Sequence, residues 1–143
     1  MQRNQAFPAL IIVPMKNFKT PLAEISYNDR EQLLHVRILE GAEMTLTNAQ
    51  VHYEKINLLL GNKKHVVLVD AKHYYRIDKE AWIYASQKEI ISNRVAVAHY
   101  NSCHANKLET SFYKAQLNTA MPVEVFNTKE EAIKWLRSHR SNL

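Results

Sequence analysis

Two polar loops contain the residues best suited to chemistry. Residues 70–76 read Asp-Ala-Lys-His-Tyr-Tyr-Arg, and residues 99–104 read His-Tyr-Asn-Ser-Cys-His. They supply cationic, aromatic and imidazole groups, which suit docking of a protein or an anionic ligand. The alternative is two solvated loops whose tyrosines cover helix ends. The candidate binding residues are Asp70, Lys72, His73, Tyr74, Tyr75, Arg76, His99, Tyr100, Asn101, Ser102, Cys103 and His104.

The second loop also resembles a reactive or metal-binding cluster. Cys103 lies beside His104 and four residues after His99, which are the residue types of a thiol–histidine nucleophile or a zinc site. Adjacent residues rarely orient toward each other, however, and paired Cys-x-x-Cys or His-x-x-x-His spacing is missing. Asp70 is better placed to cap backbone donors of its own loop than to act as a base. We therefore expect no enzymatic activity, no metal and no cofactor, with Cys103 an ordinary thiol.

Composition is typical of one soluble globular domain. The chain has 143 residues, 46% of them hydrophobic, and a single cysteine, so no internal disulfide can form. The net charge of +5 is dispersed, apart from Lys134, Arg137 and Arg140, which argues against nucleic-acid binding. The apolar run at residues 9–13 is too short to span a membrane, and the first residues lack the pattern of a secretory signal. We expect a cytoplasmic protein.

Strands must hold both loops. Residues 66–69 and 95–98 are apolar on both faces, as in central parallel strands. Ligands of open α/β sheets bind beyond the carboxyl ends of such strands, where both loops begin. Residues 22–27 and 32–39 predict a β-hairpin. Its second strand alternates apolar and polar residues around Val36, which favours a half-buried position toward the sheet edge.

Helices are predicted between the strands. A capping box at Thr47 and Gln50 precedes one helix, and Gly61 suits its exit. Asp78 is the expected N-cap of the second helix, and Thr128 with Glu131 caps the last. The apolar stripes of the four helices are Ala49, Tyr53, Ile56 and Leu60; Ala81, Tyr84, Ala85 and Ile91; Leu108, Phe112 and Ala115; and Ala132, Ile133, Trp135 and Leu136.

The resulting order is β-β-α-β-α-β-α-β-α. It predicts an α/β domain over residues 21–143, with a mostly parallel sheet of about five strands, an N-terminal β-hairpin and four helices spread over both faces. Residues 1–20 are expected to form an N-terminal arm, in which residues 9–13 add an edge strand or cover an apolar patch.

Three segments resemble a known group. They are the strand at 66–70 (Val-Val-Leu-Val-Asp), the strand at 94–98 (Arg-Val-Ala-Val-Ala) and the ending at 122–136. Residues 22–137 resemble the SpoIIAA-like group of the STAS superfamily (sulfate transporter and anti-sigma factor antagonist domains). The resemblance implies a STAS-like fold. Antagonists of that superfamily carry a phosphorylated serine in an Asp-x-Ser-Gly element. Asp70 matches the aspartate, but Lys72 and His73 replace the serine and glycine.

The leading hypothesis is a non-enzymatic STAS-like interaction or regulatory domain, without the phosphoacceptor serine, that binds a protein partner through the two loops. The alternative is a carrier or sensor for a small hydrophobic or anionic ligand held between sheet and helices. A homodimer is also predicted, because Leu10, Ile12 and Phe18 in the arm are apolar residues that one small domain leaves exposed.

Overall fold

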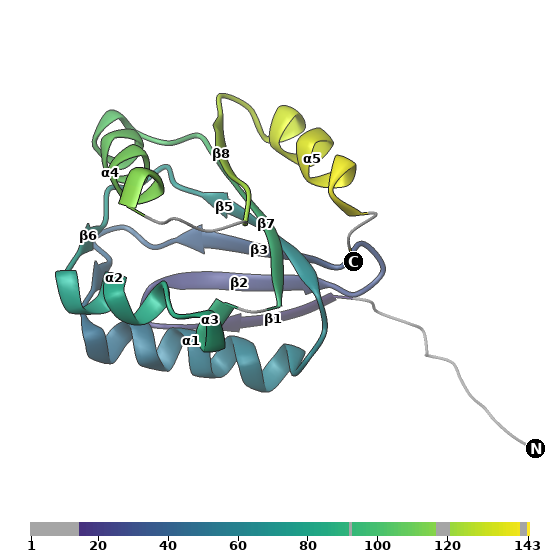
Figure 1. Cartoon of the computed structure of the whole chain (residues 1–143), viewed down its shortest axis with the longest axis horizontal. Helices are drawn as coiled ribbons and strands as arrows, with labels where there is room; N and C mark the ends of the chain where they lie inside the picture. Colours follow the sequence, from purple (N-terminus) through teal and green to yellow (C-terminus); the bar gives the residue numbers. More distant parts are fainter. Residues whose placement is uncertain (1–14, 92, 117–120, 141–142) are drawn as a thin grey trace, which may run out of the picture.

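An open β-sheet organises the chain. The computed structural model describes residues 15–91, 93–116, 121–140 and 143 (Figure 1). Within these residues the main sheet has six strands in the order β1-β2-β3-β5-β7-β8. The β1-β2 and β2-β3 pairs are antiparallel, and the other three pairs are parallel. The strands are β1 Met15–Lys19, β2 Ala23–Asn28, β3 Leu33–Ile38, β5 His65–Asp70, β7 Arg94–Tyr100 and β8 Val123–Phe126.

Helices follow the parallel strands. They are α1 Leu46–Leu60, α2 Lys79–Ala85, the four-residue α3 Lys88–Ile91, α4 His104–Gln116 and α5 Lys129–Ser138. Two short strands, β4 Glu43–Met44 and β6 Arg76–Ile77, pair in parallel outside the main sheet. The predicted α/β class and mostly parallel sheet are confirmed. The sheet gains a strand because Met15–Lys19, within the predicted arm, pairs with β2. The strand expected at residues 9–13 lies outside the described residues.

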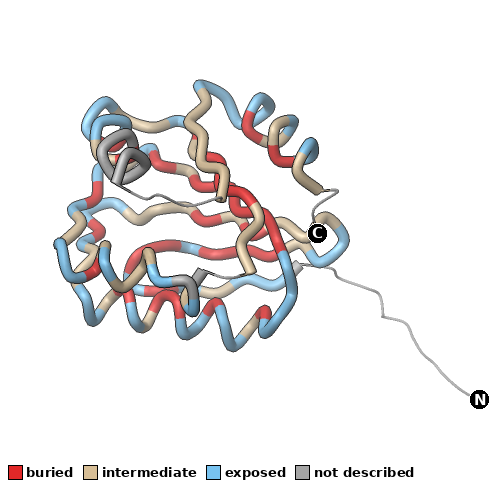
Figure 2. The backbone as a smooth tube through the Cα atoms, viewed as in Figure 1, coloured by how far each residue is buried: buried red, intermediate tan, exposed pale blue. Residues whose placement is uncertain are grey.

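Two apolar cores lie on opposite faces of the sheet. Val67 and Val69 of β5 pack with Ile56 and Leu60 of α1. The alternate β5 residues, Val66 and Leu68, pack with Ala132 and Leu136 of α5. A smaller cluster joins Ala49 and Tyr53 of α1 to Ala81 of α2. Figure 2 shows this burial concentrated in the strands, with exposed residues along the outer turns of α1. Helices therefore cover both faces, as predicted.

The position of β3 corrects one prediction. The hairpin itself is confirmed, since Ile25 is paired with Val36. However, β3 lies between β2 and β5 inside the sheet, and Val36 is only 4% exposed. The strand alternates because α5 packs on β5, β7 and β8, so His35 and Arg37 lie on a face that α5 covers only in part. A half-covered interior strand and an edge strand produce the same period-two pattern.

The start of α1 corrects a second prediction. Its N-cap is Thr45, whose Oγ1 accepts a hydrogen bond from Asn48 N at 3.1 Å. The predicted cap, Thr47, is an exposed residue inside the helix. The helix begins early because it follows β4 directly, and Asn48 Nδ2 donates to Glu43 O at 2.7 Å. Gly61 ends the helix with φ of 59°, a left-handed value that glycine adopts without a Cβ penalty.

The other two predicted caps occupy their positions. Thr128 caps α5, accepting from Glu131 N at 3.2 Å. Asp78 is the N-cap of α2, but its side chain makes no capping hydrogen bond. It lies instead 3.5 Å from the Arg76 guanidinium. The positions of both N-caps thus follow from the sequence, whereas the contact that the Asp78 side chain makes depends on the neighbouring charge of Arg76.

The inner face of α4 corrects a third prediction. Leu108 is 59% exposed, whereas Asn106 and Thr110 are buried. The side chains of Phe112 and Ala115 lie outside those described. Because α4 packs against the backbone of the loop at residues 71–75, its inner positions need hydrogen-bonding groups rather than apolar ones.

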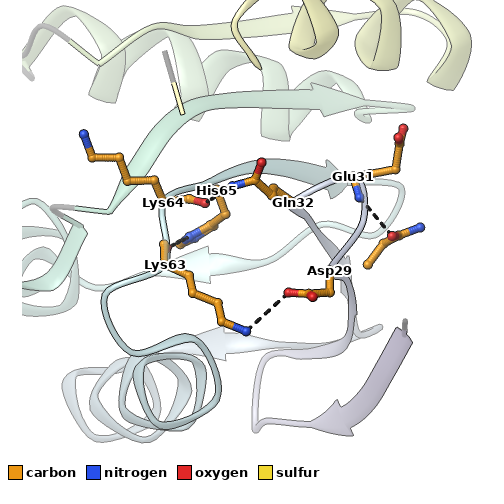
Figure 3. Close-up of polar contacts among 7 residues, drawn as sticks. Asp29, Glu31, Gln32, Lys63, Lys64 and His65 are labelled. Carbon is orange, nitrogen blue, oxygen red and sulfur yellow. Dashed lines mark hydrogen bonds and ion pairs between the residues drawn. The ribbon is translucent and has the colours of Figure 1, made fainter. Parts of the chain in front are cut away.

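Polar contacts tie together the edge of the sheet opposite the candidate loops (Figure 3). Lys63 Nζ lies 3.3 Å from Asp29 Oδ1, and Gln32 Nε2 donates to Lys64 O at 3.2 Å. His65 Nδ1 lies 3.0 Å from Lys63 O. These contacts join the hairpin turn to the connection between α1 and β5, so this edge is already occupied by the protein's own groups.

Part of the basic cluster near the C-terminus is neutralised. Arg137 and Arg140 lie 3.6 Å and 3.5 Å from the two carboxylate oxygens of Glu31. None of the helices in the described part of the chain is both long and apolar enough to cross a membrane.

Candidate functional site

The two candidate loops leave adjacent strands side by side. Asp70 and Tyr100 are paired at the ends of β5 and β7. Ala71 N donates to Tyr100 O at 3.1 Å, and Cys103 N donates to Ala71 O at 3.4 Å. The loops therefore emerge at one edge of the sheet, the edge where α/β folds bind ligands.

Asn106 fixes the first loop. Its Nδ2 donates to Ala71 O at 2.7 Å and His73 O at 2.8 Å, and its Oδ1 accepts from Tyr75 N at 3.4 Å. The side chain is 1% exposed, and Figure 1 shows α4 beside this end of the sheet. Sequence reasoning missed Asn106, although the polar pair Asn106 and Thr110 has the spacing of one helical face.

The aromatic residues of the first loop point in opposite directions. Tyr75 is buried in the core beneath β5, whereas Tyr74 is 48% exposed. The Tyr74 hydroxyl donates to Glu109 Oε1 at 3.2 Å, and the charge of Glu109 raises the pKa of Tyr74. Lys72, two residues earlier in the same loop, is also exposed. Lys72 and Tyr74 therefore form an outward-facing ledge on a fixed backbone.

Asp70 has the capping role expected of it. Its Oδ1 accepts from Lys72 N at 3.2 Å. Tyr100 is buried on the α5 side, with its hydroxyl 2.9 Å from His35 Nε2. Burial and the neighbouring Asp70 carboxylate raise the pKa of Tyr100 to about 12, so the phenol keeps its proton near neutral pH. Arg76 lies on β6, within 3.7 Å of Glu43 and 3.5 Å of Asp78.

A charged cavity of about 250 Å³ lies at the ends of β3 and β5. Strand register places Arg37 of β3 between Glu24 of β2 and Asp70 of β5. Sequence reasoning named only its first-loop members, because the hairpin residues are distant in sequence. We call this cavity the strand-end groove; its charged and polar lining is Glu24, Arg37, Glu40, Asp70, Lys72 and His73.

The second loop contributes less to this edge. His99 faces a different cavity, beside α1 and α2, where burial and the charge of Arg94 lower its pKa to about 4. Asn101 is exposed with φ of 59°, Ser102 is half-buried, and His104 is an exposed residue at the start of α4.

The structure does not assemble the thiol–histidine pair. Among the described residues, no hydrogen bond joins the Cys103 thiol to His99 or His104. No group of three or more histidine, cysteine, aspartate or glutamate side chains in the described ranges is placed to hold a metal ion.

The fold and the strand-end groove define an α/β domain with an open sheet and a polar cavity at its carboxyl edge. Comparison with protein families assigns residues 27–140 to one described as "Domain of unknown function (DUF7793)". The chain belongs to this family. No curated protein and no solved structure gave a significant match.

Proposed function

We propose that the protein is a non-enzymatic interaction domain that docks a protein partner on the strand-end groove and the ledge formed by Lys72 and Tyr74. The fixed loop carries this proposal. Because Asn106 holds residues 71–75 through three hydrogen bonds, the ledge is ordered before any partner arrives. Binding to a preorganised surface loses less conformational entropy than binding to a flexible loop.

The charges of the groove favour a protein partner. The carboxylates of Glu24, Glu40 and Asp70 and the cations of Arg37 and Lys72 line one cavity. A polyanion such as nucleic acid would meet three carboxylates there, whereas a protein surface can present both signs. The exposed Tyr74 adds an amphipathic contact of the kind enriched at protein interfaces.

The resemblance to the SpoIIAA-like group supports an interaction role of this kind and extends the proposal. Lys72 occupies the phosphoacceptor position and has no hydroxyl group. Docking at this surface is therefore not switched by phosphorylation of that residue. A partner recognises a permanent cation where the antagonists present a serine.

The test is a pull-down from the host of this protein with wild type and a Lys72→Glu/Tyr74→Ala double variant. A Lys64→Glu variant is the matched control, because Lys64 is an exposed lysine at the opposite edge of the sheet. We expect a partner that wild type and the control retain and the double variant loses. Equal capture by all three proteins would show that this surface is not the docking site.

A further inference from the structure

A second cavity lies on the face of the sheet that α1 and α2 cover, away from the strand-end groove. It has a volume of about 160 Å³ and lies between the sheet, α1 and α2. Its walls are mainly apolar and aromatic: Tyr53, Tyr75, Ile77, Trp82, Val97 and Val123. We call it the aromatic recess. A cavity of about 150 Å³ with apolar walls is large enough to hold one benzene ring.

Two nitrogen-bearing side chains also line the aromatic recess. The Arg94 guanidinium lies over the Tyr53 ring, with Cζ 4.9 Å from the ring centroid. Within the described residues, no carboxylate lies within ion-pair distance of Arg94. The Nδ1 atom of His99 is buried and makes no hydrogen bond to the described part of the chain. A buried nitrogen without a partner is costly, and a ligand group can satisfy it.

We propose that the aromatic recess binds a small single-ring aromatic acid, with the ring between Tyr53, Tyr75 and Trp82 and the carboxylate paired with Arg94. Aromatic walls favour a flat ring, which stacks offset or edge-on against them. The guanidinium matches a carboxylate in charge and in planar geometry. The neutral imidazole of His99 accepts a hydrogen bond from a hydroxyl on the ring. This site is separate from the proposed docking surface, and either can exist without the other.

Trp82 provides a direct measurement, because it lines the aromatic recess. The other tryptophan, Trp135, packs against Phe126 in the α5 core, with ring centroids 5.5 Å apart. In the full-length Trp135→Phe protein, titration with benzoate should change Trp82 emission in a saturable way. For a ligand of this size the expected Kd is on the order of 1 mM. Benzylamine, which has the same ring and the opposite charge, should bind at least about tenfold more weakly.

Two kinds of substitution in the Trp135→Phe protein locate the site: one removes the guanidinium and the other fills the recess. Arg94→Gln should weaken benzoate about tenfold through loss of a charge-assisted contact, whereas Arg137→Gln, on α5, should not. Ala85→Phe, or Ser86→Phe at the same wall if the first fails to fold, should fill the recess and abolish binding. The proposal is overturned if benzoate gives no saturable change, if benzylamine binds equally well, or if a folded filling variant still binds.

Discussion

Asn106 is a polar residue at a position where helix periodicity alone favours an apolar one. Its neighbours on α4 include the exposed Leu108, so the helix presents an amide inward and a leucine outward. This inversion is stable because the surface beneath is backbone: two carbonyls and one N–H face Asn106. An apolar side chain there would leave those groups buried without partners.

Replacing Asn106 with alanine should therefore destabilise the protein and release the loop. Two buried hydrogen bonds and one part-buried hydrogen bond are lost, and we expect the free energy of unfolding to fall by about 2–4 kcal/mol. Urea unfolding measures this loss. The amide of Tyr75 should also exchange faster with deuterium. Asn57→Ala, on the exposed side of α1, is the control and should change stability by less than about 0.5 kcal/mol. A similar effect of both substitutions would show that the Asn106 side chain does not hold the loop at residues 71–75.

Adjacent candidate residues show what sequence could not decide. Tyr74 and Tyr75 are chemically identical, yet one faces solvent and the other the core. The direction of each depends on how the loop backbone is held from α4, thirty-one residues away from Tyr75. His99 is similar: it was assigned to the loop after the strand, whereas it lies on β7 and faces a cavity lined by α1 and α2. Local patterns identify loops, whereas distant contacts decide which side chains are accessible.

Among the elements, the start of α1 offers a sharp comparison between two threonines. Thr45→Ala removes the oxygen that accepts from Asn48 N and should cost about 1 kcal/mol. Thr47→Ala replaces an exposed residue within the helix with a better helix former, so it should be neutral or slightly stabilising. Thermal unfolding of both variants measures the difference. A larger loss of stability from Thr47→Ala than from Thr45→Ala would show that Thr47 is the N-cap, as the capping-box pattern predicts.

The strands show why most of the fold, but not all of it, follows from sequence. β5 and β7 are apolar on both faces and pair in parallel in the interior, as predicted. β3 is equally interior, but its alternation depends on how far α5 extends across the sheet. That extent is set by tertiary packing, which period-two analysis of one strand does not contain. β4 and β6, two residues each, are too short to leave any pattern.

At the scale of the whole molecule, the edge of the sheet bears on association. β1 is one of the two edge strands of the main sheet, and its Phe18 packs against the protein's own core. The exposed Lys16 and Lys19 discourage another strand from adding to this edge. The predicted homodimer therefore depends on Leu10 and Ile12, which lie outside the described residues.

Deleting residues 1–14 tests this homodimer, because the deletion removes Leu10 and Ile12 and keeps β1. We expect the intact chain to sediment as a dimer and the truncated chain as a monomer. Circular dichroism of the truncated protein provides the check on folding. If both proteins sediment as monomers, or both as dimers, the arm is not the contact.

The same molecule should lose stability in mild acid, because it holds several neutral imidazoles in buried or half-buried positions. Burial is the main cause that lowers the pKa of His52 to about 3 and the pKa values of His35, His65 and His99 to about 4. In the unfolded chain a histidine titrates near 6.5. Between pH 6.5 and these lower values, the unfolded state binds protons that the folded state does not. The contribution of these histidines to the free energy of unfolding therefore has its full value above about pH 6.5. It falls as the pH drops toward 4.

Removing one of these imidazoles should make that pH dependence shallower. Within the window each buried histidine contributes a slope of up to about 1.4 kcal/mol per pH unit. His52→Gln keeps an acceptor near Thr20, whose hydroxyl lies 2.7 Å from His52 Nδ1, but deletes the titrating ring. We expect its urea-unfolding free energy to be lower at pH 7 and to fall less steeply to pH 5 than in wild type. His104→Gln, at an exposed position, should keep the wild-type slope. If His52→Gln retained the full slope, protonation of His52 in the unfolded chain would not be a source of the acid sensitivity.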